Sequence, residues 1–183
     1  MTTRIALFLL AIGTLFTSLA FAQKPVTVGG APMYADKNII QNAVNSADHT
    51  TLVAAVKAAG LVETLEGAGP FTVFAPVNSA FEMLPKGTVP TLLKPENKST
   101  LTAVLTYHVV PGRLNSKALE RLIKQSGGKA TLKTVQGESL TLTMNGDKIK
   151  VMDAKGGTAT ITITNVNQSN GVIHVIDRVL LPN

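Results

Sequence analysis

The sequence NGVIHVIDRVLLP fills residues 170–182, and its pattern decides how the rest of the chain is interpreted. From Val172 to Leu181 the residues are apolar almost without a break, which is typical of a strand in the middle of a sheet with both faces covered. His174 falls in phase with Val172 and Ile176, so we expect its imidazole to lie in the core. A buried histidine that bonds to backbone is the favoured interpretation over a ligand role.

The residues before this stretch alternate between apolar and polar, as in strands with one buried face. Residues 140–144 alternate Leu or Met with Thr, and Asn145-Gly146 is a strong signal for a hairpin turn. The same alternation returns at residues 149–151 and 159–163. We therefore expect three further strands before the last one.

The first half of the chain has a helical period instead. Leu52, Val56 and Ala59 fall on one helix face, and Gly60 is placed to end that helix. Helices early in the chain and strands late in it predict an α+β fold with an antiparallel sheet. The other expected elements are a helical turn over 62–65, a strand over 71–76, a helix over 78–85, short helices over 88–103, a strand over 105–110 and a helix over 116–125.

Residue types that carry catalysis or bind metals are sparse. The 183 residues include no cysteine, which excludes disulfides, thiolate metal sites and a cysteine nucleophile. His49, His108 and His174 stand far apart, with no metal-ligand spacing. The nucleophile elbow of serine hydrolases is absent, and no pair of carboxylates suggests acid–base chemistry. We therefore expect no metal, no cofactor and no enzymatic activity.

Residues 1–22 have the pattern of a secretory signal peptide, with Arg4, an apolar stretch and the end Ala20-Phe21-Ala22. An uncleaved membrane anchor is the rival interpretation, because the apolar stretch of about 18 residues is near the lower limit for a span. We expect cleavage before Gln23, a linker at residues 23–34 and no transmembrane span after cleavage. The protein is then secreted and periplasmic, extracellular or held at the cell surface.

Three stretches together resemble the fasciclin domain family. They are TVFAPVNSAF at residues 72–81, TYHVVPG at residues 106–112 and the stretch at residues 170–182, in the family's order and separation. The resemblance covers about residues 35–183. It implies a single domain built as a wedge-shaped β-sandwich flanked by several α-helices, in agreement with the α+β prediction.

The resemblance also implies adhesion rather than catalysis, in a secreted or surface-anchored module of a biofilm or extracellular matrix. Animal members bind integrins through the tyrosine–histidine segment and short acidic motifs, and this chain has no convincing acidic motif. A few members carry carotenoids, so a carrier of an apolar ligand such as a carotenoid or lipid is the alternative function.

In the family the long motifs lie in the core, which implies scaffold roles for their residues. Asn78 is most simply interpreted as a helix N-cap. The motif residues of this chain are Phe74, Pro76, Asn78, Phe81, Tyr107, His108, Pro111, Gly112, Gly171, His174 and Asp177.

Positive charge gathers in one segment of the chain. The formal net charge is +6, and residues 113–155 contain nine Lys or Arg but four Asp or Glu. Residues 23–112 are balanced, with six of each sign. The excess charge predicts either an ordinary solvated face or a basic surface for a polyanion.

We adopt the basic surface as a hypothesis, with an extracellular polysaccharide or another anionic cell-surface or matrix component as the partner. Nucleic acid is not expected, because the chain is exported and the segment has no aromatic residue on which bases could stack. The sequence leaves the oligomeric state open. The candidate binding residues are Arg113, Lys117, Arg121 and Lys124, which follow helical spacing, and Lys148 and Lys150, which share a strand face.

Overall fold

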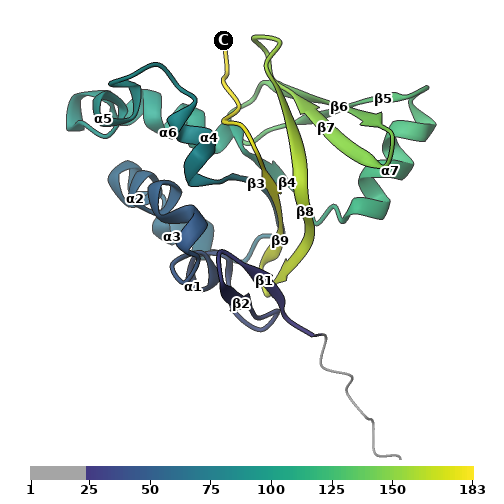
Figure 1. Cartoon of the computed structure of the whole chain (residues 1–183), viewed down its shortest axis with the longest axis horizontal. Helices are drawn as coiled ribbons and strands as arrows, with labels where there is room; N and C mark the ends of the chain where they lie inside the picture. Colours follow the sequence, from purple (N-terminus) through teal and green to yellow (C-terminus); the bar gives the residue numbers. More distant parts are fainter. Residues whose placement is uncertain (1–23) are drawn as a thin grey trace, which may run out of the picture.

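The computed structural model describes residues 24–183, so the expected signal peptide lies outside the described residues. Helices and strands together form an α+β fold (Figure 1). The strands are β1 (Val26–Val28), β2 (Ala31–Met33), β3 (Phe71–Pro76), β4 (Val109–Pro111), β5 (Lys129–Lys133), β6 (Ser139–Asn145), β7 (Lys148–Met152), β8 (Thr158–Gln168) and β9 (Gly171–Ile176). The helices are α1 (Ile39–Ala43), α2 (Thr50–Ala59), α3 (Val62–Glu66), α4 (Asn78–Glu82), α5 (Thr88–Leu92), α6 (Lys98–Tyr107) and α7 (Ser116–Gln125), with 3-10 turns η1 (Ala47–His49) and η2 (Pro95–Asn97).

Strand β9 lies inside a seven-stranded sheet of order β4-β3-β9-β8-β7-β6-β5. All six of its residues are buried, which confirms the expected central strand, although the strand ends at Ile176 and not at Leu181. The expected antiparallel sheet is mixed, because β3 pairs parallel with β9 and places Phe74 opposite His174. Strands that are about 100 residues apart in sequence are not joined by a hairpin, so no turn geometry fixes their relative direction.

The sheet bends along the long strand β8, whose pairing with β9 is interrupted by two irregularities in register. Strands β3, β4 and β9 form one side of the resulting wedge and β5, β6 and β7 the other (Figure 1). One apolar core fills the wedge, and α7 contributes Leu119 and Ile123 to it. Leu140, Leu142 and Val151 of the outer strands face the same core. The residues next to them in each strand face away from it, because successive side chains of a strand point to opposite sides.

A second core lies on the other face of β3 and β9, under the helices. Val73 and Ala75 of β3 and Ile173 and Val175 of β9 form its floor, and residues of α1, α2, α3 and α6 cover it. The two cores together explain why β9 has no exposed residue: the wedge interior covers one of its faces and the helical layer covers the other.

The segment expected as a linker is a β-hairpin. Strands β1 and β2 pair antiparallel across Gly29-Gly30, and both glycines have positive φ angles of 56° and 78°. Such a two-residue turn suits Gly-Gly, because each position needs a backbone conformation that side chains disfavour. Val28 and Met33 are buried in the helical core, so the hairpin is part of the fold.

The expected strand over 105–110 is also wrong in its first half. Helix α6 continues to Tyr107, and β4 begins at Val109. Leu101, Val104 and Leu105 are buried at the spacing of one helical face, and Tyr107 at the end of the helix is buried as well. That spacing is not visible in residues 105–110 alone, because Leu101 and Val104 precede them. Over residues 24–183, no helix has the length and apolar character to cross a bilayer.

Candidate functional site

Tyr107 and His108 lie at the end of α6 and are both buried. The Tyr107 hydroxyl donates to the Ser139 carbonyl at 3.0 Å and accepts from the Ala154 amide at 2.9 Å. Burial is the main cause that raises the pKa of Tyr107. Side chains that are 0% and 3% exposed offer no surface to a partner, so this pair serves the packing of the domain.

His174 of β9 lies against the Phe74 ring of β3, with ring centroids 5.9 Å apart and planes inclined at 29°. Its Nε2 is 2.8 Å from the Leu114 carbonyl oxygen, and its Nδ1 accepts from the Asn165 amide at 3.4 Å. Burial lowers the pKa of His174 more than the Leu114 carbonyl raises it. The imidazole is therefore neutral and connects β9 to the segment that leads into α7.

Asn78 does not cap the helix that it begins. Its Oδ1 accepts from the Thr51 amide at 3.0 Å and from the Thr50 hydroxyl at 3.2 Å, and its Nδ2 donates to the Ala47 carbonyl at 2.8 Å. The N-cap position of α4 is Val77, which makes no side-chain bond. Asn78 therefore caps α2, from a distance of 27 residues in sequence, and joins it to the start of α4.

The remaining motif residues also hold segments together. Asp177 accepts from the Thr160 amide at 2.7 Å, and the Gly112 carbonyl accepts from the Thr72 hydroxyl at 2.6 Å. Pro76 is buried and Phe81 packs in a small third cluster, whereas Pro111 is exposed at the end of β4. Gly171 lies opposite Phe71 in the parallel pair of β3 and β9.

Asn170 has a similar role that the sequence did not disclose. Its Oδ1 accepts from the Ile39 amide at 3.1 Å, and its Nδ2 donates to the carbonyls of Leu65 and Gly67 at 2.7 and 2.8 Å. One buried side chain thus joins α1 and α3 to the start of β9. The asparagine is part of the quoted motif, but an Asn-Gly pair is equally typical of an ordinary turn, so the pattern alone did not single it out.

Arg113 lies before α7, outside the helical spacing expected for it. Its guanidinium donates to the Gly171 carbonyl at 2.8 Å and to the Ser169 carbonyl at 2.9 Å. These two bonds hold the turn between β8 and β9. Arg113 therefore has a structural partner already, and the exposed cations of α7 are Lys117, Arg121 and Lys124.

The cations of α7 and those of the strands lie on different sides of the outer sheet. Helix α7 packs on the inner face, where Leu119 and Ile123 meet the wedge core. Lys148 and Lys150 alternate with the buried Ile149 and Val151, so they point away from that core. Lys148 also lines a surface pocket with Ser116 and Glu120 of α7. The predicted single basic surface is thus divided between a helix and the outer face of a sheet.

The outer face of β5–β8 carries lysines and hydroxyl groups. Lys129, Thr143, Lys150 and Thr160 stand in register across four strands. Neighbouring strands are about 5 Å apart, so Lys129 and Lys150 lie about 10 Å from each other on either side of Thr143. We name the outer-face residues of these strands the lysine–threonine face. They are Lys129, Thr131, Lys133, Ser139, Thr141, Thr143, Asn145, Lys148, Lys150, Met152, Thr158 and Thr160.

No residue of the lysine–threonine face is a carboxylate, but the exposed Asp177 borders it and accepts a hydrogen bond from the Thr160 amide at 2.7 Å. Among residues 24–183, one ion pair lies within 4.0 Å, between Lys94 and Glu96, and it is remote from the outer sheet. The described part of the chain also holds no group of three or more His, Cys, Asp or Glu that could bind a metal ion. The face therefore presents ammonium and hydroxyl groups to solvent.

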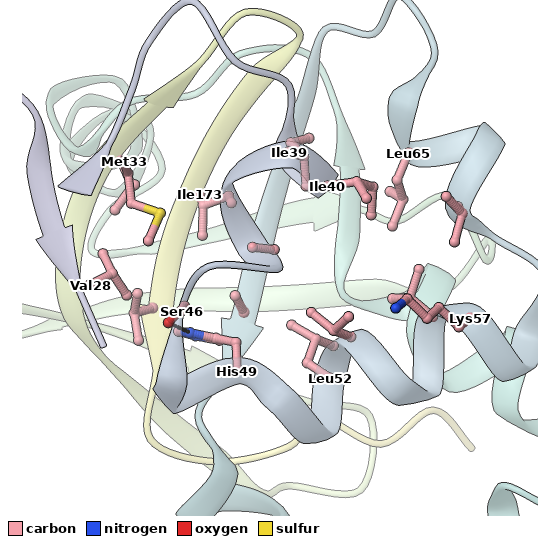
Figure 2. A pocket seen from close by; sticks show the side chains of 17 residues that line it. Val28, Met33, Ile39, Ile40, Ser46, His49, Leu52, Lys57, Leu65 and Ile173 are labelled. Carbon is pink, nitrogen blue, oxygen red and sulfur yellow. Dashed lines mark hydrogen bonds between the residues drawn. The ribbon is translucent and has the colours of Figure 1, made fainter. Parts of the chain in front are cut away.

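A second candidate site is an apolar pocket in the helical core (Figure 2). It has a volume of about 50 Å³ and lies between the β1–β2 hairpin, helices α1, α2 and α3, and the floor of β3 and β9. Val28, Met33, Ile40 and Leu65 are among its walls, and His49 is the buried polar ring on it. No sequence pattern indicated this pocket, because its walls come from nine separate helices, turns and strands.

Known proteins with similar sequences support the fold described above. The model of the family described as "Fasciclin domain" matches residues 47–182. Protein sll1483 of Synechocystis sp. is 48% identical over 160 residues, which are 87% of this chain and 82% of that protein. Cell surface glycolipoprotein MPB83 of Mycobacterium bovis is 32% identical over 166 residues, which are 88% of this chain and 68% of that protein.

A solved structure shares the fold. It is a domain pair from the insect cell adhesion molecule Fasciclin I, which superposes with a TM-score of 0.70 at 18% sequence identity. The match covers 79% of this chain and 51% of that chain, so this chain corresponds to about half of the solved pair.

Proposed function

The chain belongs to the fasciclin domain family, and we propose that it is a non-catalytic adhesion module that binds an anionic polysaccharide on its lysine–threonine face. Fasciclin domains are adhesion and interaction modules in general. The anionic partner is the finer part of the proposal. The observation that carries it is the row of Lys129, Thr143 and Lys150, which presents two ammonium groups and a hydroxyl in register.

The strands around this row support a polymeric partner. Lys133 and Lys148 extend the positive charge along β5 and β7, and threonines occupy most positions between the lysines. A flat face with several separated cations gains affinity by many weak contacts, each of which is worth little when exposed to solvent. A repeating anionic chain offers such contacts, whereas a single small anion offers one.

A location outside the cell agrees with this partner. The relative MPB83 is named a cell surface glycolipoprotein, and the solved structural neighbour is a cell adhesion molecule. Together with the expected signal peptide, these names support a secreted or surface-held protein. We propose that the partner is an extracellular polysaccharide or an acidic component of the cell surface or matrix.

The carrier function has weaker support. The apolar pocket is the site at which it would occur, and its volume of about 50 Å³ holds on the order of four waters. A carotenoid or a complete lipid is far larger than this. The observed pocket therefore favours the adhesion module, and a long apolar ligand would need a substantial opening of the helical layer.

The proposal is tested by retention on immobilised alginate, a carboxylated polysaccharide, with dextran as the neutral reference. The test variant replaces Lys129, Lys148 and Lys150 by Glu. The matched control replaces Lys117, Arg121 and Lys124 of α7 by Glu, which changes the net charge by the same amount on the other side of the outer sheet.

We expect the strand variant to lose about tenfold or more in affinity for alginate and the helix variant to lose less than about threefold. Retention of the natural protein should also fall as salt is added, because the contacts are between exposed charges. Equal losses in both variants would indicate attraction by net charge alone. Undiminished retention of the strand variant would overturn the proposal.

A further inference from the structure

The apolar pocket is closed by a part of the chain that precedes the family match. Val28, Met33, Ile39 and Ile40 belong to the hairpin and α1, whereas the match begins at residue 47. These residues line the pocket together with residues of the matched region, as Figure 2 shows for Val28, Met33 and Ile39 around Ile173. The enclosure is therefore completed by the N-terminal segment of this chain.

One ring nitrogen of a polar side chain in this enclosure has no hydrogen-bond partner among the described residues. His49 is 4% exposed, and its Nδ1 lies 2.9 Å from the Ser46 hydroxyl oxygen, a contact drawn as a dashed line in Figure 2. His49 Nε2 makes no hydrogen bond of ordinary geometry with any described group. The Ala75 backbone lies close enough to the ring to raise its pKa. A buried nitrogen without a hydrogen bond has lost its contact with water and gained nothing in return, so it is uncommon in a folded protein.

The hydrogen bonds around His49 indicate which tautomer of its ring is present. If the Ser46 hydroxyl donates to Nδ1, both of those groups are satisfied and Nε2 carries a hydrogen. The opposite arrangement leaves the hydroxyl hydrogen and the Nε2 lone pair both unpaired, which costs more. Burial also lowers the pKa of His49, in spite of the Ala75 backbone and the Asp48 carboxylate, so the ring is neutral. Nε2 is therefore a neutral N–H donor at the pocket wall.

Water is a poor occupant for this site. A buried water needs two to four polar partners, and the pocket is lined almost entirely by aliphatic side chains of Val, Ile, Leu and Met. An apolar molecule with one acceptor oxygen satisfies the donor and the walls together. Its size is limited to on the order of four non-hydrogen atoms by the volume of about 50 Å³.

We propose that this pocket binds a small, neutral, aliphatic carbonyl compound, whose oxygen accepts a hydrogen bond from His49 Nε2. The hairpin and α1 enclose the aliphatic part of the molecule, and Lys57 lies at the outer rim with its ammonium group in solvent. This binding is independent of the lysine–threonine face, which belongs to the opposite half of the fold.

The test compares acetone with isobutene, a hydrocarbon of the same shape, by titration of the methyl NMR signals of Val28, Met33 and Ile173. We expect acetone to bind about threefold to tenfold more tightly, the value of one net hydrogen bond. The nitrogen signal of His49 Nε2 should shift with acetone and stay in place with the hydrocarbon.

Two variants separate the hydrogen bond from the enclosure. His49→Phe keeps an aromatic ring but removes the donor, so it should abolish the preference for acetone. Val175→Ile adds a methyl group at the floor and should weaken both compounds about tenfold, whereas Val44→Ile, on an exposed residue after α1, should change neither. The proposal is overturned if neither compound binds, if the preference survives in His49→Phe, or if NMR detects a resident water at Nε2 that acetone does not displace.

Discussion

The Leu180 amide donates a hydrogen bond of 3.0 Å to His108 Nε2, which connects the C-terminal segment to the end of α6 across 72 residues of sequence. His108 Nδ1 lies 2.8 Å from the Val104 carbonyl oxygen and therefore carries the ring hydrogen. Both nitrogens are satisfied in the neutral ring alone. A proton on Nε2 would face the Leu180 N–H, so protonation of His108 breaks this connection.

This arrangement predicts that the protein loses stability in mild acid. Burial lowers the pKa of His108 to about 4, against 6.5 for the free side chain. The unfolded chain therefore binds a proton as the pH falls below 6.5, while the folded chain does so near 4. The stabilising contribution is complete above pH 6.5 and falls by about 2 kcal/mol between pH 6.5 and 5. His49 and His174 act in the same direction, because burial lowers their pKa values as well.

Urea unfolding at pH 7.5, 6.5, 5.8 and 5.0 measures this dependence. His108→Gln keeps a donor and an acceptor but does not titrate, so its free energy of unfolding should change with pH less steeply than that of the natural protein. A pH dependence of unchanged steepness in this variant would show that His108 does not contribute.

The burial of His174 could be predicted from sequence, because apolar neighbours in a strand fix which side faces the core. His108 is buried as expected, but it follows helix α6 and does not lie in the strand from which its burial was predicted. The central position of β9 was predictable for the same reason. The role of Asn78 was not, because a cap across 27 residues depends on where α2 and α4 meet in space. Local patterns contain no information about such a meeting.

The charge distribution shows the same limit. Sequence counting located the excess cations within residues 113–155, but it could not place α7 on one face of the sheet and Lys150 on the other. The hairpin at residues 26–33 was missed for a different reason. Its Gly-Gly turn was a usable signal, yet the strands on either side have three residues each, too few for a period to be recognised.

Asn78→Ala should lower the free energy of unfolding by about 1–2 kcal/mol, since it removes the cap of α2 and the bond to the Ala47 carbonyl. Ser79→Ala is the matched control, because Ser79 is exposed and α4 has no side-chain cap. Its stability should match the natural protein within about 0.5 kcal/mol. Urea unfolding of the two variants side by side measures the difference. If they are equally stable, Asn78 is not the cap that joins α2 to α4.

Arg113→Lys should destabilise the protein by about 1 kcal/mol, although it keeps the charge. A lysine cannot reproduce the two fixed bonds that the guanidinium makes to the carbonyls of Gly171 and Ser169. Arg121→Lys, on the exposed side of α7, should have no measurable effect. Thermal unfolding at equal ionic strength measures both. Equal melting temperatures would mean that the Arg113 bonds add nothing to stability.

Gly171→Ala tests the close approach of the β9 backbone at Gly171 to the β3 backbone at Phe71. A Cβ atom at Gly171 would lie 2.3 Å from the Phe71 carbonyl oxygen, and the parallel pairing of β3 with β9 leaves neither backbone room to move. We expect a loss of about 3 kcal/mol or more, or failure to fold. Gly146→Ala is the control, because Gly146 has a φ of 62° in the β6–β7 turn but open space around it, so it should cost about 1 kcal/mol from backbone strain alone. A Gly171 variant no less stable than the Gly146 variant would show that β3 and β9 can separate locally. The motif glycine would then serve the turn and not the contact between the strands.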